Sequence, residues 1–433
     1  MRGPHNRKMP TQTKFPWHQI ATAGVGAVLD TMSTEESMRL ADEYGTHNYK
    51  PLPVNVVRGE GARVWDSEGV EYIDCIGAYS AVAHGHLAPA VVRALQEQLT
   101  RVTLVSRAFF SPELALFLQA LAEYTGLDMS CPMNSGAEAN ETCIKLARKW
   151  AYTVKGVPKD KAEIIVTTDN FHGRTTTIVG FSSETKYKEM FGPFGPGFVE
   201  VPYGDLAALE AAITPNTCAF LAEPLQAEGG IIIPPDGYMA GVRQLCDKHN
   251  MLLIWDEVQT GFGRTGRKFG WQWEDAEPDL MAVGKPLGGG VLPVSAAVGK
   301  RHVMEILEPG DHGSTFGGNP LAAAVGIAAL AEMEVHDYAG RSERLGRRLA
   351  DGFRALNSPL VKEVRDRGLL VGIEVHEHVD SAAVTKALLA ERIVTKETRK
   401  RTFRFTPPIV TDEATIDEIV ARVGRALASV AGS

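Results

Sequence analysis

The stretch Met251–Gly290 has the sequence MLLIWDEVQTGFGRTGRKFGWQWEDAEPDLMAVGKPLGGG, in which Met251–Trp255 and Leu280–Val283 are short apolar runs. Both runs are continuously apolar and do not alternate with polar residues, which is typical of strands buried on both faces. Two further runs and the helical patterns around them are found at 163–168, 219–222, 136–154 and 237–249. Strands of this kind between helices predict an α/β fold with a mostly parallel sheet covered on both faces.

The sequence pattern also predicts how the chain is divided. Near Glu334, charged helices and a few strands such as Leu369–Val375 replace the buried runs, which indicates a smaller α+β domain. Short strands separated by glycines are expected between Asn55 and Cys75. We therefore expect a flexible N-terminal tail, a segment that packs with the small domain, a large domain and a C-terminal small domain, at 1–38, 39–90, 91–335 and 336–433.

The composition narrows the class of protein. Hydrophobic residues make up 44% and charged residues 23% of the 433 residues, which excludes a disordered or fibrous chain. The net charge of −8 argues against a nucleic-acid partner. The longest mainly apolar run, Leu321–Ala331, is too short to cross a bilayer, so no membrane partner is expected.

The cysteines and the N-terminal charges bear on localisation. The five cysteines are scattered without a CxxC pair, which favours reduced thiols and a cytoplasmic location. Four basic residues and no acidic residue precede Asp30, so a mitochondrial presequence, and hence the matrix, is the alternative.

Polar residues follow the two runs of the opening stretch. Asp256 comes directly after the first, and Lys285 lies in a glycine-rich bend after the second. In open parallel sheets, ligands bind beyond the carboxyl ends of the strands. An acid and a lysine at this edge suit pyridoxal 5'-phosphate, which needs a lysine for a Schiff base and an acid beside its ring nitrogen. The string NSGAE (Asn134–Glu138) at a predicted helix start would bind the phosphate through a hydroxyl, free amides and the helix dipole.

Two other motifs point to different chemistry and are rejected. Gly261–Gly266 matches the GxGxxG pattern of dinucleotide-binding folds, but no amphipathic helix is predicted after it. His84-Gly-His86 has a spacing found in zinc sites, but lacks acidic or cysteine companions nearby. A loop is the better interpretation of both.

Longer strings around these residues resemble class III aminotransferases of fold type I. They are Asp256 through Thr260, the GRTG turn at Gly263–Gly266, GKPLGGG and HGSTFGGNP (His312–Pro320), and the similarity runs from about Tyr44 to the C-terminus. Within the class, the chain is most similar to the ornithine aminotransferases, in the strings HNYKPLPV (47–54), GAYSAV (77–82), SRAFF (106–110), RKWAYTVKG (148–156), NFHGRT (170–175) and FRFTPP (403–408). The resemblance implies a sheet of the seven-stranded type, pyridoxal 5'-phosphate as cofactor, and a homodimer or higher homo-oligomer.

The resemblance also implies roles for the cofactor residues. Lys285 would form the Schiff base and then carry a proton between the substrate carbon and the cofactor C4′ atom, and Asp256 would pair with the pyridinium nitrogen. Phe171 and Val258 would lie against the two faces of the ring, and Gln259 would bind the ring hydroxyl. The phosphate would be bound by Ser135, Gly136 and Ala137, together with Thr315 of the partner subunit. No metal site is implied.

The substrate residues follow from the same resemblance. Tyr49 would hold the α-carboxylate of ornithine, and Tyr79 would line the pocket. Arg174 would bind the distal carboxylate of 2-oxoglutarate or glutamate, and Arg404 would bind the α-carboxylate. Two arginine forks suit a diacid, whereas ornithine requires one of them to be masked, here by Glu228. Glu228 lies in the string QAEGG, where the family more often has QGEAG.

The implied reaction transfers the δ-amino group of L-ornithine to 2-oxoglutarate, which yields glutamate and glutamate 5-semialdehyde, the open form of pyrroline-5-carboxylate. Three alternatives stay open on the same scaffold: acetylornithine aminotransferase, 4-aminobutyrate aminotransferase and an amino-acid racemase. Tyr49 and Tyr79 argue against the first two. A racemase would not require the oxo acid.

Overall fold

The computed structural model describes residues 15–399 and 401–432, and the chain divides into two compact units. The first unit comprises Met1–Arg58 and Trp65–Glu71, and the second comprises Gly59–Val64 and Tyr72–Ser433. The chain passes between them within β1 (Val56–Glu60), β2 (Arg63–Asp66) and β3 (Glu71–Asp74). These three strands confirm the short strands predicted between Asn55 and Cys75.

The described part of the first unit is mainly helical. It contains α1 (Trp17–Ala23), α2 (Gly26–Leu29) and α3 (Thr34–Tyr44). The Ser33 hydroxyl caps α3 by accepting a hydrogen bond from Glu36 N at 3.2 Å. The hydroxyls of Thr34 and Ser67 lie 2.6 Å apart and join the two segments of this unit.

The second unit is built on a seven-stranded sheet. Its order is β4-β10-β9-β8-β7-β5-β6, and all neighbours are parallel except β10, which is antiparallel to β4 and β9. The strands are β4 (Met129–Met133), β5 (Glu163–Thr167), β6 (Phe198–Val201), β7 (Thr217–Ala222), β8 (Leu252–Asp256), β9 (Leu280–Val283) and β10 (Ser295–Gly299). The predicted mostly parallel α/β sheet is confirmed.

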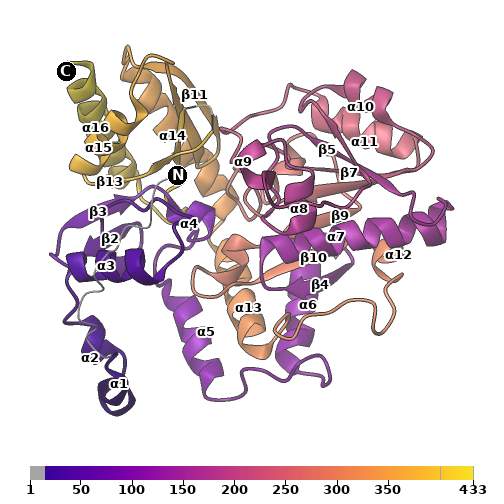
Figure 1. Ribbon diagram of the computed structural model, residues 1–433, viewed down its shortest axis with the longest axis horizontal. Coiled ribbons are helices and arrows are strands. Elements are labelled where there is room, and N and C mark those ends of the chain that lie inside the picture. The colour runs from indigo at the N-terminus through magenta and orange to yellow at the C-terminus, as the bar shows by residue number, and fades with distance from the viewer. Residues whose placement is uncertain (1–14, 400, 433) are drawn as a thin grey trace, which may run out of the picture. The chain divides into compact units, whose positions relative to one another are not determined.

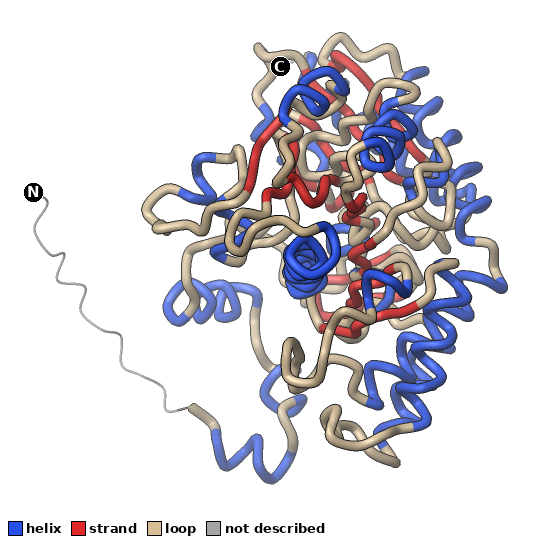
Figure 2. Tube along the Cα trace, turned by 90° about the vertical axis from the view of Figure 1, so that its right-hand side faces the viewer, coloured by secondary structure: helices blue, strands red, loops and turns tan. Residues whose placement is uncertain are grey.

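Helices cover both faces of this sheet (Figures 1 and 2). On one face, α7 (Gly136–Trp150) buries Ala139, Cys143 and Ala147 against alternate residues of the central strands. On the other face, α11 (Tyr238–Lys248) packs on β7 and β8, and α6 (Pro112–Thr125) and α13 (Pro320–Val335) share a core with β9 and β10. Because both faces are buried, the strands are apolar without alternation.

The remaining helices of this part of the chain are short or peripheral. They are α4 (Gly77–Ser80), α5 (Pro89–Leu99), η1 (Ala151–Lys155), α8 (Thr176–Gly180), α9 (Thr185–Lys188), α10 (Leu206–Ala212), η2 (Gly270–Trp273), η3 (Lys285–Gly288) and α12 (Arg301–Met304). Within residues 15–399 and 401–432, no helix has the length and apolar character needed to cross a membrane.

The C-terminal part of the second unit has its own antiparallel sheet, in the order β11-β12-β15-β14. Its elements are α14 (Tyr338–Ala355), β11 (Val361–Arg367), β12 (Leu370–Val375), α15 (Ser381–Ala390), β13 (Ile393–Val394), β14 (Lys396–Glu397), β15 (Thr402–Phe405) and α16 (Glu413–Ala431). Asp412 caps α16 by accepting from Thr415 N at 2.8 Å. This part is the α+β region that the sequence predicts, although the four domain boundaries themselves stay predictions.

Candidate active site

Two neighbouring parallel strands bring the predicted acid and lysine to one edge of the sheet. β8 ends at Asp256, and β9 ends two residues before Lys285. Asp256 pairs with Ala282 in parallel register, so the chain leaves both strands at the carboxyl edge. This edge is where ligands bind in open α/β sheets.

Lys285 has an unusual backbone and a polar partner. Its φ is +44°, in the left-handed region that non-glycine residues seldom adopt, and such strain concentrates at functional sites. Its Nζ donates to Gln259 Oε1 at 2.7 Å. Burial lowers the pKa of Lys285, although the nearby Glu228 carboxylate opposes this effect. A lowered pKa enlarges the fraction of neutral amine, the form that acts as nucleophile or base.

Three donors fix the buried Asp256 carboxylate. Its Oδ2 accepts from Asn140 Nδ2 at 2.8 Å and from His172 Nδ1 at 2.7 Å. Its Oδ1 accepts from Val258 N at 3.0 Å. Since Asn140 comes from α7 and His172 from the loop after β5, the carboxylate is held from elements on two sides.

The N-terminus of α7 forms a narrow, polar cradle beside this acid. The Ser135 hydroxyl accepts from Glu138 N, and Glu138 Oε2 accepts from Ser135 N at 2.7 Å, which completes a capping box. The amides of the first helical turn, including those of Gly136 and Ala137, have no partner within a helix and can bind an anion. A Cβ atom at Gly136 would lie 2.7 Å from Val258 Cγ1, so only glycine permits this approach.

Two buried side chains next to the cradle have polar groups that suit a ligand. Gln259 Nε2 is buried and hydrogen-bonds to none of the described residues. Glu223 accepts from Phe171 N at 3.1 Å, and burial raises the pKa of Glu223 to about 7, although His172 opposes the rise.

The residues at this edge fit pyridoxal 5'-phosphate. Lys285 has a lowered pKa and would meet the cofactor's aldehyde, and the anchored Asp256 carboxylate would meet its ring nitrogen. The buried Gln259 amide donor suits the ring hydroxyl, and the helix N-terminus at Gly136 suits the phosphate.

A second group of predicted residues meets beside Lys285. Arg404, on β15, is 4% exposed, and its Nη1 lies 2.5 Å from Glu228 Oε1. The Arg404 guanidinium also lies 5.1 Å from the centre of the Tyr79 ring. Burial raises the pKa of Glu228, but Arg404 and Lys285 outweigh burial and hold that pKa below its ordinary value. The acid is therefore held as a carboxylate on the arginine.

The other predicted residues are less closely joined. The Arg174 side chain is exposed and stacks over Tyr187 at 3.9 Å, with the Phe171 ring at 5.6 Å from its guanidinium. Thr315 is exposed in the loop before α13. Tyr49 belongs to the first unit and is also exposed. The roles of these three residues stay predictions.

The two rejected motifs are packed loops. After Gly261–Gly266 comes the short 3₁₀ helix η2, so no long helix opens there, and Arg264 is fully buried with two backbone carbonyls at 2.8 and 2.9 Å. His84 bonds to a helix carbonyl at 3.0 Å, and His86 bonds to Asp74 at 2.9 Å.

Sequence reasoning missed three side chains at this site: Asn140, His172 and Glu223. His172 lies inside the quoted string NFHGRT, and Asn140 lies four residues after Gly136, one helical turn from the cradle. Their spacing contained a signal, but only the contacts with Asp256 reveal it.

Comparisons with known proteins agree with this geometry. The family model for aminotransferase class III matches residues 44–427. An ornithine aminotransferase of Geobacillus sp. (strain WCH70) is 48% identical over 92% of this chain and 99% of its own. A solved ornithine aminotransferase from Toxoplasma gondii, with PLP at partial occupancy in its active site, has a TM-score of 0.91 and 41% identity over 92% of this chain and 95% of its own. An acetylornithine aminotransferase from Elizabethkingia anophelis has a TM-score of 0.84 and 39% identity over 92% of this chain and 100% of its own. The chain therefore belongs to the class III aminotransferase family.

Proposed function

We propose that this enzyme transfers the δ-amino group of L-ornithine to 2-oxoglutarate, and that its cofactor is pyridoxal 5'-phosphate. The products are glutamate and glutamate 5-semialdehyde, which cyclises to pyrroline-5-carboxylate. The proposal rests on the ion pair between the buried Arg404 and the partly buried Glu228 next to Lys285. Relatives named ornithine aminotransferase support it.

When bound, the cofactor supplies a carbonyl carbon that takes up the amino group and a ring that withdraws electrons from the reacting carbon. Asp256 would keep the ring nitrogen protonated, and Gln259 Nε2 would donate to the ring hydroxyl. Ser135, Gly136 and Ala137 would hold the phosphate, and Phe171 and Val258 would enclose the ring.

Lys285 is proposed to move the proton. Its Nζ would take a proton from the substrate carbon that bears the reacting amine and return it to the cofactor C4′ atom. Its lowered pKa favours the neutral form that this step needs.

The paired Arg404 and Glu228 are proposed to select the amine that reacts. While Glu228 occupies Arg404, the α-carboxylate of ornithine would go to Tyr49, with Tyr79 lining the pocket, and the δ-amine would reach the cofactor. For 2-oxoglutarate, Glu228 would withdraw, so that Arg404 binds the α-carboxylate and Arg174 the distal one.

Removing the masking acid tests this selection. In Glu228→Ala, Arg404 is expected to stay free, so glutamate binds better and ornithine reacts partly through its α-amine. One charge-assisted contact is worth about 1.5–3 kcal/mol, which corresponds to about one to two powers of ten in selectivity. Single-turnover kinetics with ornithine and glutamate measure the ratio of the two rates.

Glu184→Gln is the matched control, because Glu184 is a nearby acid that lies 3.6 Å from Arg399 and not on Arg404. If the rate ratio of Glu228→Ala equals that of the wild type, the selection mechanism is wrong and specificity rests on Tyr49 and Tyr79.

A second candidate function is acetylornithine aminotransferase, favoured by the solved Elizabethkingia anophelis neighbour. A panel of ornithine, N-acetylornithine and 4-aminobutyrate with 2-oxoglutarate separates the candidates. Ornithine is expected to give the highest kcat/KM, with pyrroline-5-carboxylate as product. A reaction that proceeds without any oxo acid would instead indicate a racemase.

A homodimer is proposed as the active form. Large apolar side chains lie exposed around α5, α6 and the loop of Thr315: Leu99, Leu104, Phe109, Phe110, Leu116 and Phe316. Exposed apolar groups of this size are typical of an interface between subunits. Thr315 of the partner subunit would then complete the phosphate site. We further propose a cytoplasmic location.

Sedimentation at assay concentration tests the assembly. We expect a dimer that cofactor stabilises further, since a ligand bound across an interface favours association. Phe110→Asp, at a side chain that is fully exposed, should shift the equilibrium toward monomer and lower activity in parallel. A fully active monomer would overturn this proposal.

A further inference from the structure

The loop that carries Glu228 is strained and depends on outside contacts. Gln226 and Ile232 close it through two backbone hydrogen bonds of 3.0 and 2.9 Å. Inside it, Ile231 has a φ of +55°, which a β-branched residue rarely adopts. Such a conformation persists only where surrounding contacts hold it.

Arg365, on β11, supplies those contacts. Its Nη2 donates to Gly230 O at 2.7 Å, and its Nε lies 3.2 Å from the same carbonyl and 3.1 Å from Ile231 O. Both carbonyls belong to the strained end of the loop, two and three residues after Glu228. Thr398 adds a hydrogen bond from its hydroxyl to Glu228 O at 2.7 Å.

The C-terminal sheet places Arg365 and Arg404 in one row. Arg365 is opposite Gly372 on β12, and Gly372 is opposite Arg404 on β15, so all three lie on the same face. A Cβ at Gly372 would come within 3.0 Å of Ile231 Cδ1, so the glycine leaves room for that side chain. The loop therefore packs against this row of residues. Arg365 binds its backbone carbonyls, and Arg404 binds the Glu228 carboxylate.

The Arg365 guanidinium is itself fixed. Its Nη1 lies 2.5 Å from Glu374 Oε2, it pairs with Glu363, and its Nη2 donates to Thr402 Oγ1 at 3.0 Å. Lys362 also pairs with Glu374, at 2.6 Å, but touches neither loop carbonyl. The side chain of Arg365 is thus set in place before any substrate arrives.

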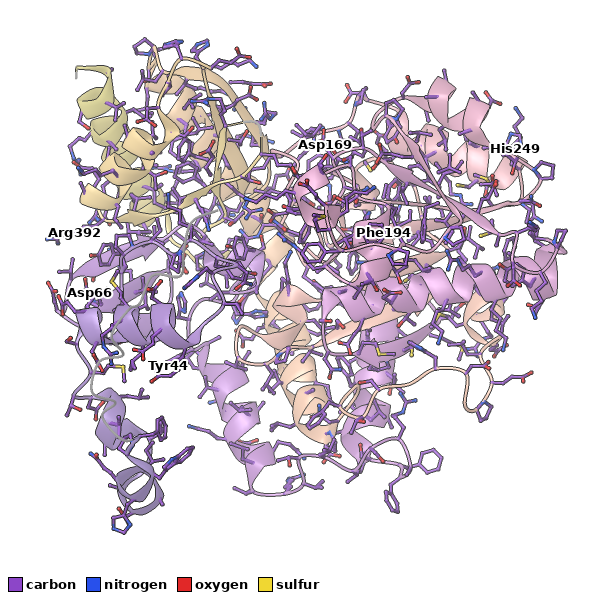
Figure 3. The ribbon with its side chains drawn as sticks, in the orientation of Figure 1. Tyr44, Asp66, Asp169, Phe194, His249 and Arg392 are labelled. Carbon is purple, nitrogen blue, oxygen red and sulfur yellow. The ribbon has the colours of Figure 1, made fainter. Side chains whose placement is uncertain are left out.

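The loop is also limited on its other side. A Cβ at Gly229 would lie 3.2 Å from Asp169 O, and Figure 3 labels Asp169 at this position after β5. The Gln226 amide donates to Thr168 O at 2.5 Å in the same region. The backbone of the loop at residues 229–231 is therefore held between this segment and Arg365.

We infer that Arg365 is a positioning residue that determines amine selectivity, because it holds the strained Gln226–Ile232 loop so that Glu228 can mask Arg404. This inference deepens the proposed function and rests on it. Arg365 is expected to act through the loop and Glu228, since its hydrogen bonds to this segment go to the backbone carbonyls of Gly230 and Ile231.

The test compares Arg365→Met and Arg365→Lys with the control Lys362→Met, which removes the other cation from Glu374 and leaves the loop untouched. In Arg365→Met, the ornithine-to-glutamate preference in single turnovers is expected to fall about tenfold, mainly through a lower apparent Kd for glutamate. Arg365→Lys keeps the positive charge but lacks the planar guanidinium, so its preference should lie between those of the wild type and Arg365→Met. Lys362→Met should keep the wild-type preference.

A double-mutant cycle with Glu228→Ala decides whether the two residues act as one unit. If Arg365 acts through Glu228, Arg365→Met has no further effect on the preference once Glu228 is alanine. Additive effects, or an unchanged preference in Arg365→Met, would overturn the inference while leaving ornithine transamination intact.

Backbone hydrogen exchange gives a readout that does not depend on the substrate. The amides of residues 226–232 are expected to exchange faster in Arg365→Met and Arg365→Lys than in Lys362→Met. If exchange rises in the Arg365 variants but the wild type does not use ornithine, the proposed function is wrong, whereas the role of Arg365 in positioning the loop is supported. Equal protection in all variants would remove the positioning role itself.

Discussion

Lys285→Ala is expected to lose nearly all transamination. Lys285, held by Gln259, is the group proposed to move the proton at the reacting carbon, and general acid–base catalysis contributes about 10²- to 10⁴-fold. The loss should appear in kcat, because the remaining cofactor and substrate contacts are left in place. Rapid-mixing kinetics with ornithine measure it, and borohydride reduction followed by mass spectrometry should find no cofactor attached to residue 285.

Lys300→Ala is the matched control, because Lys300 also follows a strand of the same sheet, β10, but pairs with Asp279 at 3.2 Å. It should keep the wild-type rate and the covalent attachment. Wild-type turnover in Lys285→Ala would show that another group moves the proton.

Asp256→Asn is expected to bind the cofactor more weakly and to slow the chemical step. Its carboxylate is the partner of the ring nitrogen in the proposed site, and removal of one well-placed electrostatic group costs about 10²- to 10³-fold in kcat. The change also gives Asn140 and His172 a neutral acceptor in place of a charged one. Titration of the apoenzyme should show a cofactor Kd about tenfold higher or more.

His172→Gln separates the loss of the Asp256 charge from the loss of its hydrogen-bonded support. It removes the donor 2.7 Å from Asp256 Oδ2 and keeps the carboxylate, so its losses should be smaller in both kcat and cofactor Kd. If Asp256→Asn and wild type bind the cofactor equally, the carboxylate does not pair with the ring nitrogen.

Much of the fold follows from local patterns in the chain. Met251–Trp255 and Leu280–Val283 are short and continuously apolar because they form central strands β8 and β9, buried on both faces. The parallel register then brings Asp256 and Lys285 to the same edge, as the residues after each run predict.

The sequence does not reveal contacts that depend on the order of strands. His172 and Asp256 are 84 positions apart, and they meet because β7 alone separates β5 from β8 in the sheet. Arg365 and Gly230 are 135 positions apart, one on β11 of the C-terminal sheet and the other in the loop after β7 of the seven-stranded sheet. No periodicity links such pairs, so these roles become visible only in three dimensions.

The pairing of Glu228 with Arg404 can be predicted from the sequence only in part. Each residue type suits its role, and the resemblance to known strings indicates the pair, but burial and the 2.5 Å contact come only from the fold. The two residues are 176 positions apart, and strands β11, β12 and β14 of the C-terminal sheet come between them in the sequence.

The choice of the δ-amine is tested most directly by following one nitrogen atom. Ornithine labelled with the heavy nitrogen isotope at either the α or the δ position is incubated with the enzyme and unlabelled 2-oxoglutarate, and the glutamate formed is analysed by mass spectrometry. The δ label is expected to appear in glutamate, and the α label is expected to remain in pyrroline-5-carboxylate. Glutamate labelled from the α position would contradict it.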